Sequence, residues 1–172
     1  MSSATLVSTD EYLATSYRPD RELLDGQIVE RNVGEYDHSN LQTALTAWIY
    51  NREFEWNVRV LVEQRVQVHP DRYRVPDICV VVRERKTEPI LTAPPLICIE
   101  ILSKDGSLRS TQHRVDDYLN FGVPHIWVLD PVLRRAYLCS RRGFQEPDAG
   151  VLEVASSPIR IPLDELFAGL DR

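Results

Sequence analysis

Two acidic residues stand inside apolar stretches that otherwise have the composition of buried strands. Asp77 opens "DICVVV", and Glu100 lies within "LICIEIL". Because desolvating an ion costs several kcal/mol, a buried carboxylate needs a partner that compensates its charge. Successive side chains of a strand point to opposite faces, so Asp77 shares a face with Cys79, and Glu100 shares one with Cys98. If the two strands are neighbours, we expect the two carboxylates to lie close together.

A pair of close carboxylates favours a bound cation. Two such groups repel each other, so either one of them holds a proton or a cation lies between them. Mg²⁺ (or Mn²⁺) suits this position, because Mg²⁺ takes one or two protein carboxylates and completes its shell with water and phosphate oxygens. Such an ion polarises a phosphoryl group and lowers the pKa of bound water, which is the usual route to phosphodiester hydrolysis. Lys104 and Arg114, which follow the Glu100 strand, are the candidate cations that would position the attacking water or neutralise charge in the transition state.

A strand, a helix and a second strand follow one another in the middle of the chain. The apolar run Leu96–Leu102 is typical of a strand that is covered on both faces. Apolar residues at helical spacing predict a helix from about Leu108 to Phe121, which Gly122 and Pro124 would end. "HIWVLD" predicts a strand over residues 125–130. This order predicts a βαβ unit in which the two strands are parallel neighbours.

The remaining elements are expected from shorter patterns. "VSTDEYLATSY" predicts a short first helix, and Asp25-Gly26 between two apolar runs predicts a hairpin. A second helix should begin with Asp37 or Ser39 as its cap, and alternating valines predict one half-buried strand over Val58–Val68. A turn around "PDRYR", an edge hairpin in "RRAYLCSRRGF" and a short closing helix in "LDELF" complete the chain. The order α, β, β, β, α, β indicates an α/β fold with a mixed sheet flanked by helices, in one domain over residues 1–172.

The composition narrows the class of protein. With 43% hydrophobic and 27% charged residues, the chain is an ordinary globular protein rather than a disordered one. No apolar run approaches the roughly 20 residues that cross a membrane, and the N-terminus lacks a secretory pattern, so we expect a cytoplasmic location. A net charge of −6 argues against binding DNA through the whole surface, although a local basic groove remains compatible with it. Three cysteines without CxxC spacing argue against a disulfide framework or a zinc site.

The motifs resemble a known nuclease family. Pro76-Asp77 at one strand, followed by an acid near the end of the next, is similar to the PD-(D/E)xK restriction-endonuclease-like superfamily. The ordered set "RELLDG", "DHSNLQTAL", "VPDICVV", "EILSKD", "DDYLNFGVPHIWVLDP" and "LDELF" resembles the Uma-type family of bacterial putative restriction endonucleases, over roughly Glu22–Phe167. The resemblance implies a restriction-endonuclease-like αβββαβ core and a metal-dependent nuclease acting on DNA, with Asp77 and Glu100 as metal ligands.

The resemblance also implicates residues that have simpler interpretations. Glu22 and His38 match positions where the family often carries the same residue types. Glu22 can equally well be an exposed acid in a hairpin. A partly buried histidine whose hydrogen bonds are made is a more common interpretation of His38 than a catalytic histidine. Asp77 could instead be a turn acid, and Glu100 a buried acid paired with an arginine. The Ile101 carbonyl is a candidate for a further metal ligand.

One position departs from the superfamily pattern. The lysine expected two residues after the acid is Leu102 here. Uma-type members typically carry a lysine in the following helix, four residues before the tyrosine, and this chain has Arg114 there. Arginine stays charged and can orient a phosphate, but it cannot act as a general base, so Lys104 is the alternative cation. A second hypothesis is therefore a domain that keeps the fold, has lost catalysis and binds nucleic acid or another protein. The oligomeric state stays open, with a homodimer as one candidate.

Overall fold

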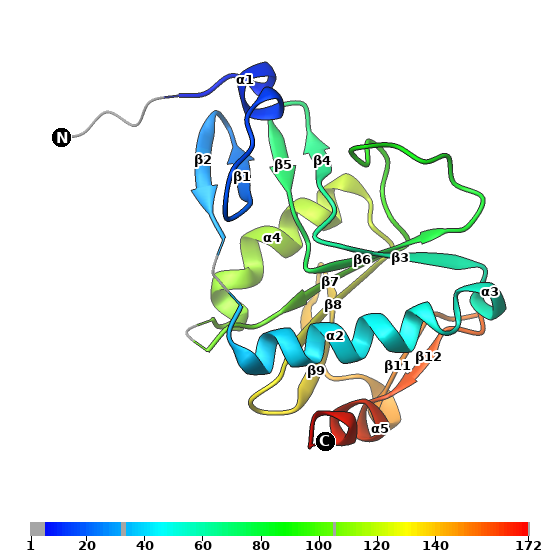
Figure 1. Ribbon diagram of the computed structural model, residues 1–172. Coiled ribbons are helices and arrows are strands. Elements are labelled where there is room, and N and C mark those ends of the chain that lie inside the picture. The colour runs from blue at the N-terminus through cyan, green and yellow to red at the C-terminus, as the bar shows by residue number, and fades with distance from the viewer. Residues whose placement is uncertain (1–5, 32–33, 105, 172) are drawn as a thin grey trace.

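A six-stranded mixed sheet runs through the centre of the protein (Figure 1). The structure is a computed structural model that describes residues 6–31, 34–104 and 106–171. The strands follow the spatial order β10-β9-β8-β7-β6-β3, and only β7 and β8 among these neighbours are parallel. Their bounds are β3 (Val58–Val62), β6 (Ile78–Val82), β7 (Ile97–Ile101), β8 (His125–Asp130), β9 (Arg135–Ser140) and β10 (Gly143–Gln145). The predicted parallel pair and the predicted final hairpin of β9 and β10 are confirmed.

Helix α4 (Leu108–Phe121) connects β7 to β8, as the βαβ pattern predicts. Its N-terminus is closed by a reciprocal pair of hydrogen bonds between Ser107 and Ser110, which satisfies backbone donors that the helix itself cannot pair. It ends at Gly122, whose φ of 95° lies in the left-handed region that favours glycine. Val115 and Tyr118 are buried against the sheet.

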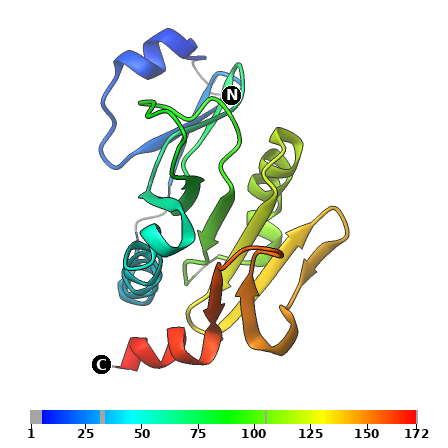
Figure 2. The same cartoon turned by 90° about the vertical axis from the view of Figure 1, so that its right-hand side faces the viewer.

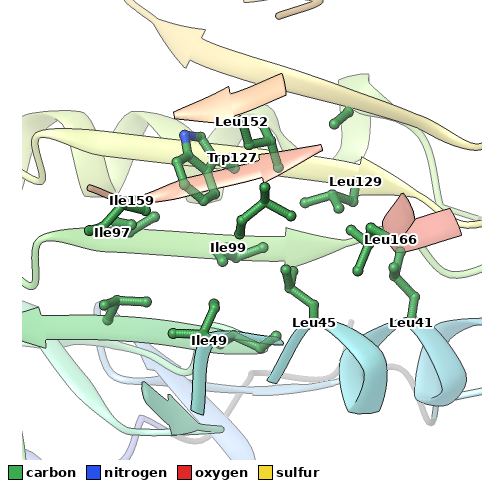
Figure 3. Packing of buried hydrophobic residues seen from close by; sticks show 14 of the residues in the cluster. Leu41, Leu45, Ile49, Ile97, Ile99, Trp127, Leu129, Leu152, Ile159 and Leu166 are labelled. Atoms are coloured by element: carbon green, nitrogen blue, oxygen red, sulfur yellow. The ribbon is translucent and has the colours of Figure 1, made fainter. Parts of the chain in front are cut away.

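The two faces of the central sheet are covered by different elements. Helix α4 packs on one face, and α2 (Tyr36–Tyr50) and α5 (Leu163–Ala168) pack on the other with the hairpin β11 (Val151–Glu153) and β12 (Arg160–Pro162). Figure 2 shows α2 in cyan and α4 in yellow-green on opposite sides of the strands. In Figure 3, Leu41, Leu45 and Ile49 of α2 point toward the sheet. Each such fully buried side chain contributes about 1.5–3 kcal/mol, so this face anchors α2 firmly.

A second, four-stranded sheet lies beside the first, and we call it the small sheet. Its order is β2-β1-β5-β4, with β1 (Arg21–Leu24), β2 (Gln27–Glu30), β4 (Val66–His69) and β5 (Arg72–Arg74). Helix α1 (Thr9–Ala14), which Ser8 caps, packs Tyr12 against Leu23 and Tyr73 of this sheet. The predicted hairpin of β1 and β2 is confirmed, and both Asp25 and Gly26 have positive φ. The short elements α3 (Glu53–Trp56), η1 (Asp148–Gly150) and η2 (Gly169–Asp171) complete the described chain.

Three sequence-based expectations were wrong in detail. The single strand predicted over Val58–Val68 is two strands in different sheets, because Glu63 turns the chain with a φ of 51°. The segment predicted as a turn contains β5, although the turn itself lies between β4 and β5. Helix α2 begins after Glu35, which makes no side-chain cap, rather than with Asp37 or Ser39 as its cap.

None of the helices in the described parts of the chain is long and apolar enough to cross a membrane. One domain over residues 1–172 and a cytoplasmic location stay predictions.

Candidate active site

The two acids lie opposite each other on neighbouring strands. In the antiparallel pair β6–β7, Cys79 faces Cys98 and Ile78 faces Ile99, and one further step places Asp77 across from Glu100. Both side chains therefore project toward the α4 face of the sheet, as their shared parity with the cysteines predicts. Residues so opposed have Cβ atoms about 4.5–5.5 Å apart. Each acid is only 5% exposed, and both line one pocket of about 150 Å³.

Asp77 is surrounded by hydrogen-bond donors. The backbone N–H of Ile101 donates to its Oδ2 over 2.7 Å, and Nη2 of Arg31 donates to its Oδ1 over 2.9 Å. Nε2 of His38 lies 3.3 Å from Oδ2. Burial raises the pKa of Asp77, but the hydrogen bond and charge of His38, with the Ile101 N–H and Arg31, outweigh it and hold that pKa below its usual range. The bond to Asp77 in turn raises the pKa of His38. Asp77 is therefore ionised at neutral pH.

Glu100 is less well compensated than Asp77. The Tyr118 hydroxyl donates to its Oε1 over 2.5 Å, whereas Nη1 of Arg114 lies 3.4 Å from the same oxygen. Burial raises the pKa of Glu100 to about 7, with the charge of Asp77 adding to the rise and Arg114 opposing it. A carboxylate in this condition gains from any additional cation in the pocket.

Arg114 is shared between two acids. Its Nη1 donates to Oε1 of Glu22 over 2.7 Å, so it lies nearer to Glu22 than to Glu100. Glu22 is fully buried and also accepts from the backbone N–H of Val75 and from Arg74, each over 2.9 Å. Burial alone would lower the pKa of Arg114, but the charges of Glu100 and Glu22 raise it. Arg114 is thus a permanent cation at the site, and Glu22 is a buried acid rather than an exposed one.

Comparison with known proteins identifies the family. The model of the Uma2 family, described as "Putative restriction endonuclease", matches residues 9–170. The chain belongs to this family. A crystal structure described as that of a putative nuclease belonging to DUF820 from Anabaena variabilis is similar over 95% of this chain and 99% of its own, with a TM-score of 0.81 and 25% sequence identity. No curated protein matches the sequence. The predicted resemblance and the restriction-endonuclease-like α/β fold are confirmed.

The donor set of this Uma2 member fits a hard divalent cation. Within residues 6–31, 34–104 and 106–171, no group of three or more His, Cys, Asp and Glu side chains is placed to hold a metal. A metal here would depend on Asp77 and Glu100, which is the number of carboxylates that Mg²⁺ usually takes from a protein. It would share Asp77 with Arg31 and His38, and it would supply positive charge that compensates the carboxylate of Glu100.

The other predicted site residues occupy different places. Leu102, at the position of the superfamily lysine, is buried in the apolar cluster beneath α4. Lys104 is exposed and borders a neighbouring hollow of about 270 Å³, which shares His38 and Leu102 with the pocket of the acid pair. Ile101 reaches Asp77 through its N–H, and its carbonyl as a metal ligand stays a prediction.

Sequence reasoning missed several residues that the fold brings to the site. Arg31 reaches Asp77 across 46 positions of sequence, and Gln42 donates to the Asp77 carbonyl over 3.0 Å. The pocket is also lined by Ser110 and Thr111 of α4. Arg31 follows the β1–β2 hairpin by one residue, so the hairpin was the available signal, but only the docking of the small sheet shows where the arginine points.

Proposed function

We propose that this member of the Uma2 family is a metal-dependent endonuclease that hydrolyses DNA phosphodiester bonds. The observation that carries the proposal is the opposition of Asp77 and Glu100 across β6 and β7 in one pocket. These acids would hold Mg²⁺ or Mn²⁺, with the Ile101 carbonyl as a further ligand. When bound, the ion would polarise the phosphate and lower the pKa of a water that it binds.

The protein groups around the acids have distinct tasks. Arg114 stays charged, so it can orient a phosphate oxygen and stabilise developing negative charge, but it cannot take a proton from water. Arg31 and His38 keep Asp77 ionised, and Arg31 presents positive charge at the same pocket. Arg31 and Arg114 therefore place fixed positive charge beside the acid pair of an acidic protein, which supports a substrate that carries phosphate.

Cleavage assays test the proposal directly. Purified protein is incubated with single-stranded and double-stranded DNA in Mg²⁺, Mn²⁺ or EDTA. We expect cleavage with either metal and none in EDTA, and we expect Asp77→Asn and Glu100→Gln to abolish it. Asp116→Asn, which alters an exposed carboxylate on α4, is the matched control and should cleave like the parent. Cleavage that survives Asp77→Asn would contradict the assignment.

A second function is a binding module that has lost catalysis. Leu102 in place of the lysine, and the ion pair that already joins Arg31 to Asp77, favour it. Such a module would bind DNA, or another protein, equally well in EDTA and would cleave nothing. Fluorescence anisotropy with labelled DNA, measured with and without Mn²⁺, separates it from the nuclease.

A further inference from the structure

Four charged side chains join α4 to the small sheet through three consecutive contacts, and the α4 backbone between Arg114 and Asp117 closes the loop. Arg114 and Asp117 lie three positions apart on α4 and therefore on the same side of the helix. The β1–β5 register pairs Leu23 with Tyr73, and one further step places Glu22 opposite Arg74. The helix thus presents one cation and one anion to a strand pair that presents the opposite charges. We call Arg114, Glu22, Arg74 and Asp117 the charge ring.

Each contact of the charge ring is close, and the ring is largely shielded from solvent. Arg114 donates to Glu22 over 2.7 Å, Arg74 donates to Glu22 over 2.9 Å, and Nε of Arg74 donates to Asp117 over 2.7 Å. Outside the ring, Arg72 donates to the second oxygen of Asp117 over 2.6 Å. The side chains of Glu22, Arg74 and Asp117 are 0%, 7% and 8% exposed. Both carboxylate oxygens of Glu22 and of Asp117 accept hydrogen bonds, so the orientation of these two side chains is fixed.

Stability alone does not explain an arrangement of this kind. A buried ion pair is weak evidence for stability, because well-packed apolar residues of similar volume often do as well or better. What the charge ring does fix is the place of Arg114, whose Nη1 lies 2.7 Å from Glu22 and 3.4 Å from Glu100. The ring therefore holds the cation beside Glu100 without letting it close on that acid.

We propose that Asp117 and Arg74 are positioning residues for the acid pair. They fix Glu22, Glu22 holds Arg114, and Arg114 is kept from pairing closely with Glu100, which can then bind a divalent ion. The inference deepens the proposed nuclease function and rests on it. Without the negative charge of Asp117, Arg74 draws Glu22 toward itself, and Arg114 turns to Glu100, where it competes with the metal. Outer partners that contact a metal ligand directly, as Arg114 contacts Glu100, typically change metal affinity about 10- to 100-fold, and Asp117 acts on Arg114 through Arg74 and Glu22.

Calorimetric titration with Mn²⁺ tests the positioning role. We expect Asp117→Asn to weaken Mn²⁺ binding by about 10- to 100-fold, and the exposed neighbour Asp116→Asn to bind like the parent. A merely structural role would lower the melting temperature of Asp117→Asn and leave the Mn²⁺ affinity of the folded protein unchanged. That result would overturn the inference.

A crystal structure of metal-free Asp117→Asn gives a readout that needs neither metal nor activity. We expect Nη1 of Arg114 to lie closer to Glu100 than the 3.4 Å of the parent, and an unmoved Arg114 overturns the inference. Parent protein that binds no Mn²⁺ would instead defeat the proposed function, and the position of Arg114 would still decide the positioning role. If Asp117→Asn does not fold, Arg72→Gln removes the outer partner of Asp117 together with the contact of Arg72 to Asp25. Asp117 then holds Arg74 more tightly and leaves Glu22 to Arg114, so Nη1 of Arg114 must lie farther from Glu100 than the 3.4 Å of the parent for the inference to stand.

Discussion

Replacing Glu100 with glutamine should stabilise the metal-free protein at neutral pH. Burial raises the pKa of Glu100 from 4.5 to about 7. The folded state therefore binds this proton more tightly than the unfolded state, so the contribution of Glu100 to stability is most favourable below pH 4.5 and is lost as the pH rises through 7. The shift corresponds to about 3 kcal/mol of lost stability above pH 7. Glutamine keeps the shape and an oxygen for Tyr118 but carries no charge, so Glu100→Gln should recover that free energy.

Urea unfolding in EDTA at pH 8 and pH 5 measures the effect. We expect the free energy of unfolding of Glu100→Gln to exceed that of the parent by about 3 kcal/mol at pH 8 and by less than about 1 kcal/mol at pH 5. Mn²⁺ at a hundred times its Kd should stabilise the parent by about 2.7 kcal/mol, and this gain should shrink sharply in the variant. Glu165→Gln, at an exposed acid of α5, is the control and should show neither change.

The opposite result would refute the reasoning in a specific way. If Arg114 already neutralises Glu100, then Glu100→Gln leaves a buried cation without that partner and destabilises the protein. A variant less stable than the parent at pH 8, together with a melting curve that ignores Mn²⁺, would favour the binding module. A difference that does not change between pH 5 and pH 8 would show that the carboxyl group does not titrate in this range.

Four further substitutions probe the surroundings of the acids. Arg31→Met should tighten Mn²⁺ binding in calorimetric titration, because it removes a cation that competes for Asp77, and weaker binding would mean that Arg31 orients the acid instead. Cys79→Ala and Cys98→Ala should each lower the free energy of unfolding by about 1 kcal/mol, with Mn²⁺ affinity unchanged, because both thiols are fully buried in the apolar cluster under α4. Lys104→Ala should leave the rate of DNA cleavage nearly unchanged, because this lysine is exposed and lies outside the pocket lining, and a lost activity would make it the catalytic cation.

The parts of the fold that the sequence predicts well are those with a local physical cause. Helix α4 was predicted over the residues it occupies, because its apolar spacing is regular and Gly122 ends it. Strands β7 and β8 followed from short apolar runs, and the run of β7 is typical of a strand covered on both faces. The division of Val58–Val68 was not predictable, because a single residue, Glu63, adopts a conformation that its residue type does not favour.

The residues of the candidate site also differ in how far a local pattern predicts their positions. Strand parity places Asp77 on the face of Cys79 and Glu100 on the face of Cys98, and the pairing of β6 with β7 then brings both acids to one face. The burial of Glu22 depends on how the small sheet docks against α4, so periodicity could not separate it from an ordinary exposed acid. The contact of His38 with Asp77 depends equally on where the first turn of α2 lies relative to β6. Long-range docking, rather than local pattern, decides these positions.

The contacts of the charge ring can be lost by a local opening that leaves the main core folded. Glu22 and Arg114 are 92 positions apart, and they meet only while the small sheet stays docked on α4. A local opening that separates these two parts breaks the contacts of Asp117 with Arg72 and Arg74 and the contact of Arg114 with Glu22, yet leaves the six strands and the α2 face packed. Such partial openings require less free energy than complete unfolding. Hydrogen exchange that is faster in the small sheet than in β7 and β8 would therefore indicate that the arrangement around Glu100 is lost while the central sheet stays folded.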